Sequence, residues 1–272
     1  METTRMETVG RSLARMSLYY RDDRVEIYNG DALQLIPEVG PIGGLITDPP
    51  YSSGGQFRGD RTRTTVEKYV QTGTAAYRPD FGGDSRDQRG FLAWSSLWLN
   101  AAYNIADESA IVACFIDWRQ LPVMTDAIQS AGWVWRGIAV WDKGFGRPRN
   151  GGFSSATEFV VWGSKGSLEP NDRYGHGIHR SPTPKDRQHI TQKPEAVMAW
   201  LLDTVSRGKT ILDPFCGSGT TLKVAKELGH QAIGIEADPD FCRVSADRVA
   251  QTLPLEQIPE KQMVPDWSLF DD

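Results

Sequence analysis

Short apolar runs alternate along most of the chain with longer segments whose apolar residues recur at helical spacing. The apolar runs predict seven strands, at residues 25–28, 44–47, 110–116, 133–141, 158–162, 210–212 and 232–235. The helical spacing predicts helices at residues 32–36 (ending at Pro37), 91–105, 121–131, 195–205, 219–228 and 239–250. Strand–helix units of this length indicate an α/β fold, with a mostly parallel sheet covered by helices on both faces.

Two long segments are largely loop-like, although the second contains the strand predicted at 158–162. Residues 52–90 are rich in Gly, Thr, Arg and Asp, and residues 143–188 are largely polar, with a basic, Gly-rich beginning. Loops of this length inside a compact domain are usually functional or disordered. We therefore interpret residues 1–272 as a single domain that carries two loop-like insertions, at 52–90 and 143–188.

Composition narrows the class of protein. A hydrophobic fraction of 39% in 272 residues supports a buried core. The chain has neither an apolar stretch near the roughly 20 residues that span a bilayer nor a signal-like N-terminus, so we expect a cytoplasmic protein without a membrane segment. The three widely spaced cysteines favour free buried thiols, and His176 and His179, flanked by glycines, make only a weak metal site.

The net charge of −5 argues against a uniformly basic nucleic-acid-binding protein, but the charge is unevenly distributed. Residues 136–193 hold ten Lys or Arg against five Asp or Glu, residues 57–89 seven against five, and residues 251–272 one against five. A basic middle with an acidic tail is compatible with phosphate contact in one groove. Solvated surface charges would give the same pattern.

The segment 210–221, TILDPFCGSGTT, combines an apolar strand, an acid and a glycine-rich turn before a helix. Gly217 and Gly219 would let a ligand approach the backbone, and the helix start would present unpaired N–H groups to it. Glu236 ends the next strand, where a carboxylate can accept hydrogen bonds from both hydroxyls of a ribose. A ligand-free turn and a surface acid remain the alternative, but together the two features favour a nucleoside cofactor.

The tetrapeptide Asp48-Pro49-Pro50-Tyr51 follows a buried strand. Two consecutive prolines cannot continue a helix or a central strand, so the chain must turn out of the sheet at this point. Taken alone, Asp-Pro-Pro favours a merely rigid turn at the end of a buried strand.

Four short motifs in order give a more specific indication. Asp213 to Thr221 resembles the S-adenosylmethionine motif of amino-methyltransferases, and residues 191–194 (TQKP) resemble the motif that holds the methionine end of this cofactor. Residues 48–51 resemble the catalytic motif, and residues 29–31 (NGD) the acid that contacts the cofactor's adenine. With the catalytic motif first, most of residues 25–249 resemble the beta group of DNA amino-methyltransferases. The resemblance implies a Rossmann-like methyltransferase fold of permuted motif order, with a mostly parallel seven-stranded sheet and one antiparallel strand.

The resemblance implies a set of cofactor-binding residues. Lys193 would lie near the methionine carboxylate, where a cation makes physical sense, although a solvated lysine before a helix is the plainer alternative. The residues that would bind S-adenosylmethionine are Asp31, Thr191, Lys193, Asp213, Pro214, Phe215, Gly217, Ser218, Gly219, Thr220, Thr221 and Glu236.

The same resemblance makes Asp48, Pro49, Pro50 and Tyr51 the catalytic residues. An exocyclic base amine is a poor nucleophile, so a catalyst must hold its N–H groups and aim its lone pair at the methyl group. The Asp48 carboxylate and a main-chain carbonyl, that of Pro49, would be the acceptors, held in place by the stiff prolines. Tyr51 would stack on the extruded base. Neither a metal nor a covalent intermediate is needed, and Cys216 is expected to pack rather than react.

Double-stranded DNA is the expected partner, gripped by the two insertions. The space before residues 191–194 is small for a separate recognition module, which suggests a homodimer. In the family that the chain resembles, cytosine enzymes more often carry Ser at the first position of the catalytic motif, so the resemblance, with Asp48 there, implies N6 of adenine. N4 of cytosine, an RNA or other amine, and a non-catalytic cofactor-dependent DNA-binding protein are the alternatives. The basic residues that could contact phosphates or guanines are Arg58, Arg61, Arg63, Lys68, Arg78, Arg86, Arg89, Lys143, Arg147, Arg149, Lys165, Arg173, Arg180, Lys185 and Arg187.

Overall fold

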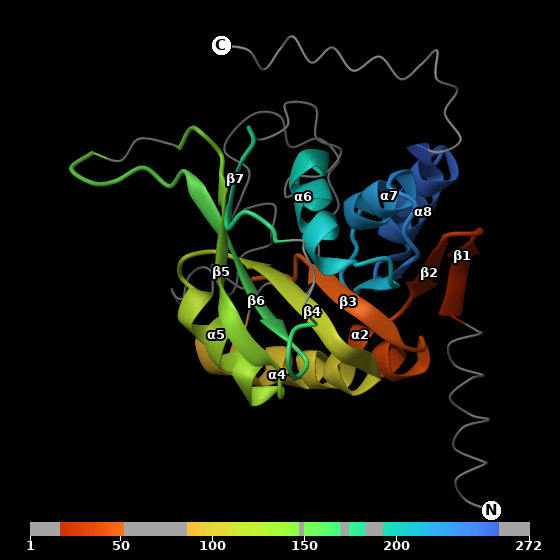
Figure 1. Ribbon diagram of the computed structural model, residues 1–272, viewed down its shortest axis with the longest axis horizontal. Coiled ribbons are helices and arrows are strands. Elements are labelled where there is room, and N and C mark those ends of the chain that lie inside the picture. Colours follow the sequence, from red (N-terminus) through yellow and green to blue (C-terminus); the bar gives the residue numbers. More distant parts are fainter. Residues whose placement is uncertain (1–16, 52–85, 147–149, 170–173, 183–192, 256–272) are drawn as a thin grey trace, which may run out of the picture.

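The computed structural model describes residues 17–51, 86–146, 150–169, 174–182 and 193–255 (Figure 1). These residues form one nine-stranded sheet with the order β1-β2-β9-β8-β3-β4-β6-β5-β7. The strands in chain order are β1 (Leu18–Arg21), β2 (Val25–Asn29), β3 (Ile42–Thr47), β4 (Ala106–Ile116), β5 (Val134–Asp142), β6 (Thr157–Ser164), β7 (Ile178–Arg180), β8 (Ile211–Asp213) and β9 (Ala232–Glu236).

The expectation of seven strands was wrong by one strand at each edge of the sheet. The seven predicted strands form its continuous centre, from β2 to β5, while β1 and β7 are additional. The strand β6 runs antiparallel to both neighbours, as expected for the single reversed strand, but β1 also runs antiparallel to β2. Both additional strands are short and lack the apolar run of a buried strand, which is why periodicity did not reveal them.

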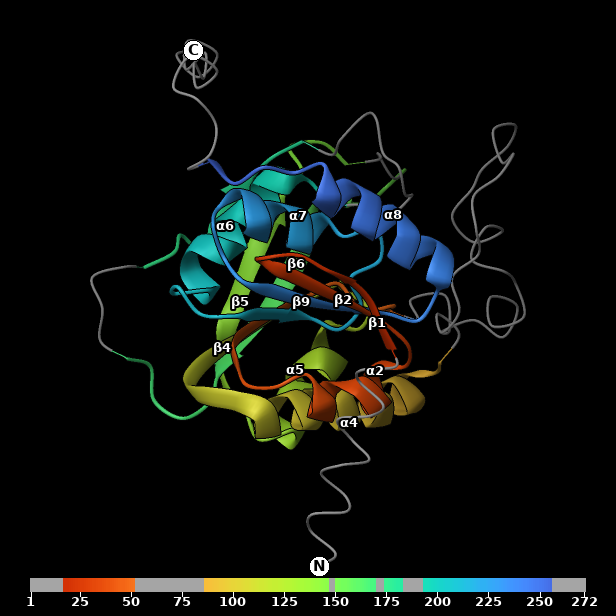
Figure 2. The ribbon, with the colours of Figure 1, turned by 90° about the vertical axis from the view of Figure 1, so that its right-hand side faces the viewer.

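Helices cover both faces of the sheet, as predicted (Figure 2). One layer contains α2 (Ala32–Leu35), α4 (Gln88–Ile105) and α5 (Leu121–Ser130), and the other contains α6 (Glu195–Val205), α7 (Thr220–Glu227) and α8 (Pro239–Ala250). The helical segment that was predicted to end at Pro37 continues past it. A 3-10 turn, η1 (Ile36–Glu38), follows α2 directly and has the proline near its start. No helix in the described ranges is both long enough and apolar enough to cross a bilayer.

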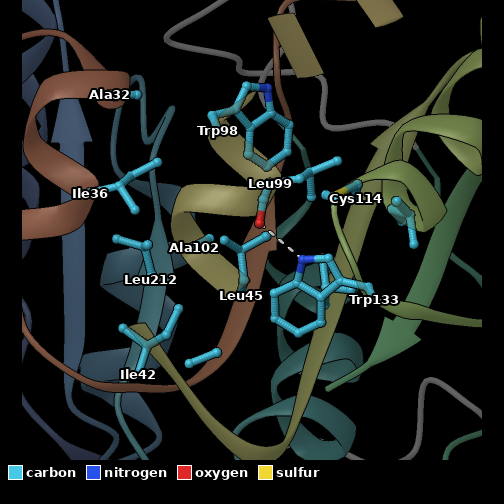
Figure 3. Close-up of a cluster of buried hydrophobic side chains, with 14 of the residues drawn as sticks. Ala32, Ile36, Ile42, Leu45, Trp98, Leu99, Ala102, Cys114, Trp133 and Leu212 are labelled. Atoms are coloured by element: carbon cyan, nitrogen blue, oxygen red, sulfur yellow. Dashed lines mark hydrogen bonds between the residues drawn. The ribbon is translucent and has the colours of Figure 1, made fainter. Parts of the chain in front are cut away.

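Two apolar cores lie on opposite faces of the sheet. Along β4, side chains alternate between them, so that Val112 and Cys114 join the core under α4 and α5 while Ala113 and Phe115 join the core under α6 to α8. This alternation is the period of two expected of an extended strand. In the first core, buried Trp133 donates a hydrogen bond from Nε1 to the carbonyl oxygen of Leu99, 3.0 Å away (Figure 3). The buried indole thus has a partner for its only polar atom.

The strand directions bring several chain segments to one edge of the sheet, the edge formed by the carboxyl ends of the parallel strands. The parallel strands β3, β8 and β9 end at Thr47, Asp213 and Glu236. Because β6 is antiparallel to β4, its first residues lie at the same edge, with Phe159 opposite Ile116. Ligands of open α/β sheets bind outside the carboxyl ends of the strands, so this edge is where a site is expected.

Candidate functional site

A cavity of about 420 Å³ opens at this edge of the sheet. This volume lies in the usual range for small-molecule pockets. Gly219, which was expected among the binding residues, is not in its lining, and Thr191 lies outside the described residues. The expected site residues that do line the cavity are Asp31, Asp48, Pro49, Pro50, Tyr51, Lys193, Asp213, Pro214, Phe215, Gly217, Ser218, Thr220, Thr221 and Glu236.

The glycine turn leaves its backbone open to the cavity. Gly217 has a φ of +50°, and a Cβ there would meet no protein atom within 4 Å. Gly219 is needed for a different reason, because its φ is +77° and a Cβ would lie 2.1 Å from the Ser245 hydroxyl of α8. One glycine therefore serves ligand access, and the other serves packing of the turn against α8.

The two carboxylates on this side of the cavity are held by backbone N–H groups and, for Asp213, also by the hydroxyls of Thr47 and Thr221. Glu236 accepts hydrogen bonds from the backbone N–H groups of Gly217 (2.9 Å) and Asp238 (2.9 Å). Asp213 accepts from the hydroxyl of Thr47 (2.8 Å) and from the backbone N–H of Phe215 (3.2 Å). Burial raises the pKa of Glu236, and it raises that of Asp213 to about 6. Asp213 therefore braces the turn against β3, while Glu236 faces the cavity.

Asp31 lies on the same side and caps α2. Its carboxylate accepts hydrogen bonds from the backbone N–H groups of Leu33 (2.9 Å) and Gln34 (3.3 Å). The backbone N–H of Gly30 donates to the carbonyl oxygen of Glu236 (2.9 Å), which ties the ends of β2 and β9 together. Asp31 and Glu236 thus line one region of the cavity from neighbouring strands.

Aromatic side chains form an apolar wall that the sequence motifs did not indicate. The Phe215 ring centroid lies 5.1 Å from that of Trp94 and 5.2 Å from that of Trp98. The Arg86 guanidinium lies 4.2 Å from the Trp94 centroid, in a cation–π geometry. Arg86, Trp94, Met198 and Phe241 all line the cavity. In the sequence, Trp94, Met198 and Phe241 resemble ordinary core-facing positions of amphipathic helices.

The opposite side of the cavity is the corner formed by residues 48–51. Tyr51 donates a hydrogen bond from its hydroxyl to Oδ1 of Asp48. Lys193 donates from Nζ to Oδ2 of Asp48 (2.5 Å) and to the hydroxyl oxygen of Tyr51 (3.1 Å). The Lys193 side chain is only 6% exposed, whereas that of Asp48 keeps 21% of its surface exposed. Each oxygen of the Asp48 carboxylate therefore already has one side-chain partner.

Glu158, which sequence reasoning did not single out, completes this corner. Its carboxylate lies 3.2 Å from Nζ of Lys193 and 2.6 Å from Nζ of Lys143. Burial alone would raise the pKa of Glu158, but the two ammonium groups hold it below its ordinary value. Burial alone would likewise lower the pKa of Lys193, but Asp48 and Glu158 raise it. Lys193, expected near a cofactor carboxylate, thus lies between two carboxylates of the protein.

For Asp48 and Tyr51, burial is the largest influence on the pKa. It raises the pKa of Asp48 above its ordinary value, although the ammonium of Lys193 acts in the opposite direction. Burial and the nearby Asp48 raise the pKa of the Tyr51 phenol well above its usual range. The phenol therefore stays protonated near neutral pH and can act as a hydrogen-bond donor.

The expected DNA-contacting residues are only partly described. Arg86 and Arg89, at the end of the first insertion, are described, whereas residues 52–85 lie outside the described ranges. The same is true of Arg147, Arg149, Arg173, Lys185 and Arg187. Arg86 has a protein partner in Trp94, and three further described members also have protein partners. Lys143 contacts Glu158, Lys165 lies 3.9 Å from Glu108, and Arg180 lies 3.1 Å from Asp142.

Side chains of the types that bind metals, and one cavity-lining thiol, can be located within the part of the chain that the structure describes. No group of three or more His, Cys, Asp or Glu side chains within those ranges is arranged to hold a metal ion. Cys216 lines the cavity but is 6% exposed, and burial raises the pKa of its thiol well above the usual range. A protonated thiol is a weak nucleophile.

Known proteins match both the sequence and the fold. The N6/N4 amino-methyltransferase family, described as DNA methylase, matches residues 43–247. The type II methyltransferase M.ScaI of Streptomyces caespitosus is 25% identical over 90% of this chain and 87% of its own length. Two solved structures share the fold. The PvuII cytosine-N4-specific DNA methyltransferase has a TM-score of 0.66 at 16% identity, covering 90% of this chain and 92% of its own. The M1.HpyAVI–SAM complex has a TM-score of 0.59 at 21% identity, covering 82% of this chain and 99% of its own. Since the family match extends over most of the chain, this protein belongs to the N6-adenine/N4-cytosine DNA methylase family.

Proposed function

We propose that this DNA methyltransferase transfers the methyl group of S-adenosylmethionine to N6 of an adenine extruded from duplex DNA. The observation that supports this most directly is that one cavity joins the glycine turn and Glu236 to the corner of Asp48 and Tyr51. A methyl donor on one side and an amine on the other would then meet within a single enclosed site.

The lining of the cavity fits S-adenosylmethionine. Gly217 leaves open space above the turn, Phe215 and Trp94 provide an apolar wall, and Glu236 provides a carboxylate for a ribose. When bound, this cofactor supplies an electrophilic methyl group on a sulfonium. The protein has to place that methyl group and shield it from water.

The corner at residues 48–51 supplies the acceptors for the base amine. We assign Asp48 as the carboxylate that accepts one N–H of the amine, and the main-chain carbonyl of Pro49 as the second acceptor. Because Tyr51 occupies Oδ1 of Asp48, the arriving base has to take over that hydrogen bond. Tyr51 is then free to stack on the base. The lone pair of the amine would point toward the glycine-turn side of the cavity.

Adenine is favoured over cytosine because the catalytic motif begins with Asp48. The solved PvuII enzyme, whose fold this chain shares, is a cytosine-N4-specific DNA methyltransferase, so N4 of cytosine is the second candidate. The two substrates have the same exocyclic amine chemistry, and the described corner could hold either amine.

Base extrusion requires a grip on the surrounding duplex, for which we propose the insertions at 52–90 and 143–188. Their arginines and lysines would contact phosphates and guanine edges. We further propose a homodimer, because little chain is left for a separate recognition module. Sedimentation of the active species tests this, and a strictly monomeric active enzyme would contradict it.

The decisive experiment is incubation of the purified protein with methyl-labelled S-adenosylmethionine and unmethylated duplex DNA, followed by digestion to nucleosides. Label in N6-methyldeoxyadenosine supports the proposal, and label in N4-methyldeoxycytidine replaces it with the second candidate. Binding of both ligands without any transfer of label would indicate a non-catalytic DNA-binding protein. Protection of the DNA from restriction enzymes would then map the methylated sequence.

A further inference from the structure

We infer that Glu158 is a positioning residue for methyl transfer, which holds the Lys193 ammonium so that it occupies one oxygen of Asp48 and leaves the other for the base amine. This inference rests on the proposed function and adds a residue outside the four motifs. Glu158 does not line the cavity, so it would act through Lys193 rather than on the substrate.

The strand register explains how Glu158 reaches this position. It pairs with Trp141 across the β5–β6 ladder, and the backbone N–H of Lys143 donates to the carbonyl oxygen of Ala156 (2.8 Å). The antiparallel pair therefore carries Glu158 and Lys143 side by side to the sheet edge where β3 ends, just before Asp48. Without the reversed direction of β6, its first residues would lie at the opposite edge of the sheet.

The charges form a balanced row. Lys143, Glu158, Lys193 and Asp48 alternate in sign, with nitrogen–oxygen distances of 2.6, 3.2 and 2.5 Å along the row. Three oxygens surround Nζ of Lys193. Those of Asp48 and Tyr51 accept hydrogen bonds from it, whereas Oε2 of Glu158 lies 3.2 Å away as an ion pair without hydrogen-bond geometry. Glu158 thus attracts, through its charge, an ammonium whose two hydrogen-bonded partners are the groups that must meet the base.

This arrangement separates the two oxygens of Asp48. Oδ2 faces a buried ammonium that has a second anchor, while Oδ1, among the residues that the structure describes, is held by the hydroxyl of Tyr51 alone. Exchange with the base therefore requires movement of one phenol and leaves the ion pair intact. With Glu158 neutralised, the Lys193 ammonium loses its anchor and can shift over both oxygens, where it competes with the amine.

The groups that influence ionisation of Asp48 come from several elements. Lys193 lowers the pKa of Asp48 and Glu158 raises it, while Asp213, at the end of β8, interacts electrostatically with Asp48. Tyr51 hydrogen-bonds to Asp48 and interacts in turn with Asp117, after β4. Loss of Glu158 should therefore lower the pKa of Asp48, and loss of Lys193 should raise it.

The test compares Glu158→Gln with Glu26→Gln, a matched control on β2 whose carboxylate pairs with Arg21 outside the cavity. The readout is the single-turnover rate of methyl transfer from S-adenosylmethionine to unmethylated plasmid DNA across a pH series. We expect Glu158→Gln to lower the plateau rate by about ten- to thirtyfold, with the Kd for S-adenosylmethionine within about twofold of wild type. The acidic limb of its profile should move to lower pH.

Two further variants separate positioning from mere structure. Lys193→Met should move the acidic limb to higher pH, because Asp48 then faces Glu158 without a cation between them. Adding Glu158→Gln to Lys193→Met should move the acidic limb back to lower pH. The same substitution then lowers the transfer rate of the wild type but partly restores the pH profile of the Lys193→Met variant. A folding defect would produce no such reversal. The inference is overturned if Glu158→Gln matches Glu26→Gln in both rate and pH profile.

Failure of the proposed function would look different, because wild type itself would transfer no label to DNA. The urea midpoint of unfolding then tests the cluster without any substrate. Lys193→Met should lose stability relative to wild type as the pH rises from about 5 to 8, and Glu158→Gln should reduce that loss in the double variant. A double variant with the same pH dependence as Lys193→Met would show that Asp48 and Glu158 do not repel each other once the lysine is gone, which would contradict the charge cluster on which the inference rests.

Discussion

Two pairs of carboxylates lie on the two sides of the cavity, with Glu158 behind its lining, and they are held in different ways. On the side proposed to bind the cofactor, Glu236 accepts hydrogen bonds from backbone N–H groups, and Asp213 accepts from one backbone N–H and from the hydroxyls of Thr47 and Thr221. On the side proposed to bind the substrate, Asp48 and Glu158 have lysine ammonium groups as partners and, for Asp48, the Tyr51 phenol. Backbone donors cannot leave without unfolding the turn, whereas long lysine and tyrosine side chains can rotate away.

This difference matches the two tasks proposed for the site. A cofactor that returns in every cycle is best met by acceptors that are already in place, because fixed groups need no reorganisation when it binds. A base taken from DNA must replace existing partners, and the exchange is easiest where those partners are themselves side chains. The comparison predicts that changes on the substrate side alter the rate, while changes on the cofactor side alter affinity or stability.

The strongest challenge to the comparison is Asp48→Ala. It removes the acceptor for the amine, and we expect the rate of transfer to fall by about 10³-fold or more, since loss of one preorganised group commonly costs 10²- to 10³-fold. Calorimetry should give nearly unchanged affinity for S-adenosylmethionine. Near-normal turnover in the purified variant would show that Asp48 does not hold the amine.

The pH dependence of stability tests the role of Asp213, on the glycine-turn side of the cavity. Its pKa is raised from 3.8 to about 6, so the folded state holds the proton more tightly than the unfolded state. Stability should therefore fall as the pH rises from about 4 to 6, by up to about 3 kcal/mol at 1.36 kcal/mol per pKa unit. Asp213→Asn should remove this slope, as measured by urea unfolding across that pH range. A wild-type slope that persists in the variant would assign the titration to another group.

Glu236→Ala should act on affinity. The loss of a carboxylate that accepts from a ribose removes a charge-assisted hydrogen bond worth about 1.5–3 kcal/mol, which corresponds to a Kd for S-adenosylmethionine about 10- to 100-fold weaker. At saturating cofactor the single-turnover rate should stay within about threefold of wild type. A large fall in that rate with unchanged affinity would reverse the roles assigned to the two sides.

The cofactor side was the easier one to predict from the sequence because its contacts are local. The turn, its glycines and its acid lie within residues 213–219, and Glu236 ends the next strand. The substrate side depends on contacts between distant residues, since Lys193 and Asp48 are 145 residues apart. In the sequence Glu158 is an ordinary strand residue, and only the reversed direction of β6 brings it to the site. The edge strands β1 and β7 were missed because they are short and half-exposed.

Cys216 gives the smallest expected effect and tests the boundary between the two sides, because it lines the cavity beside the turn. A Cβ on Gly234 would lie 2.9 Å from its sulfur, so the thiol packs closely against β9. Cys216→Ala should lower the free energy of unfolding by about 1 kcal/mol, through lost packing, and leave the transfer rate within about twofold. Urea unfolding and the single-turnover assay measure these two quantities separately. Because burial keeps the thiol protonated, its removal should not affect the chemistry. Abolished transfer with preserved cofactor affinity would instead require an attacking sulfur, which would place a reactive group on the side of the cavity that the comparison assigns to binding.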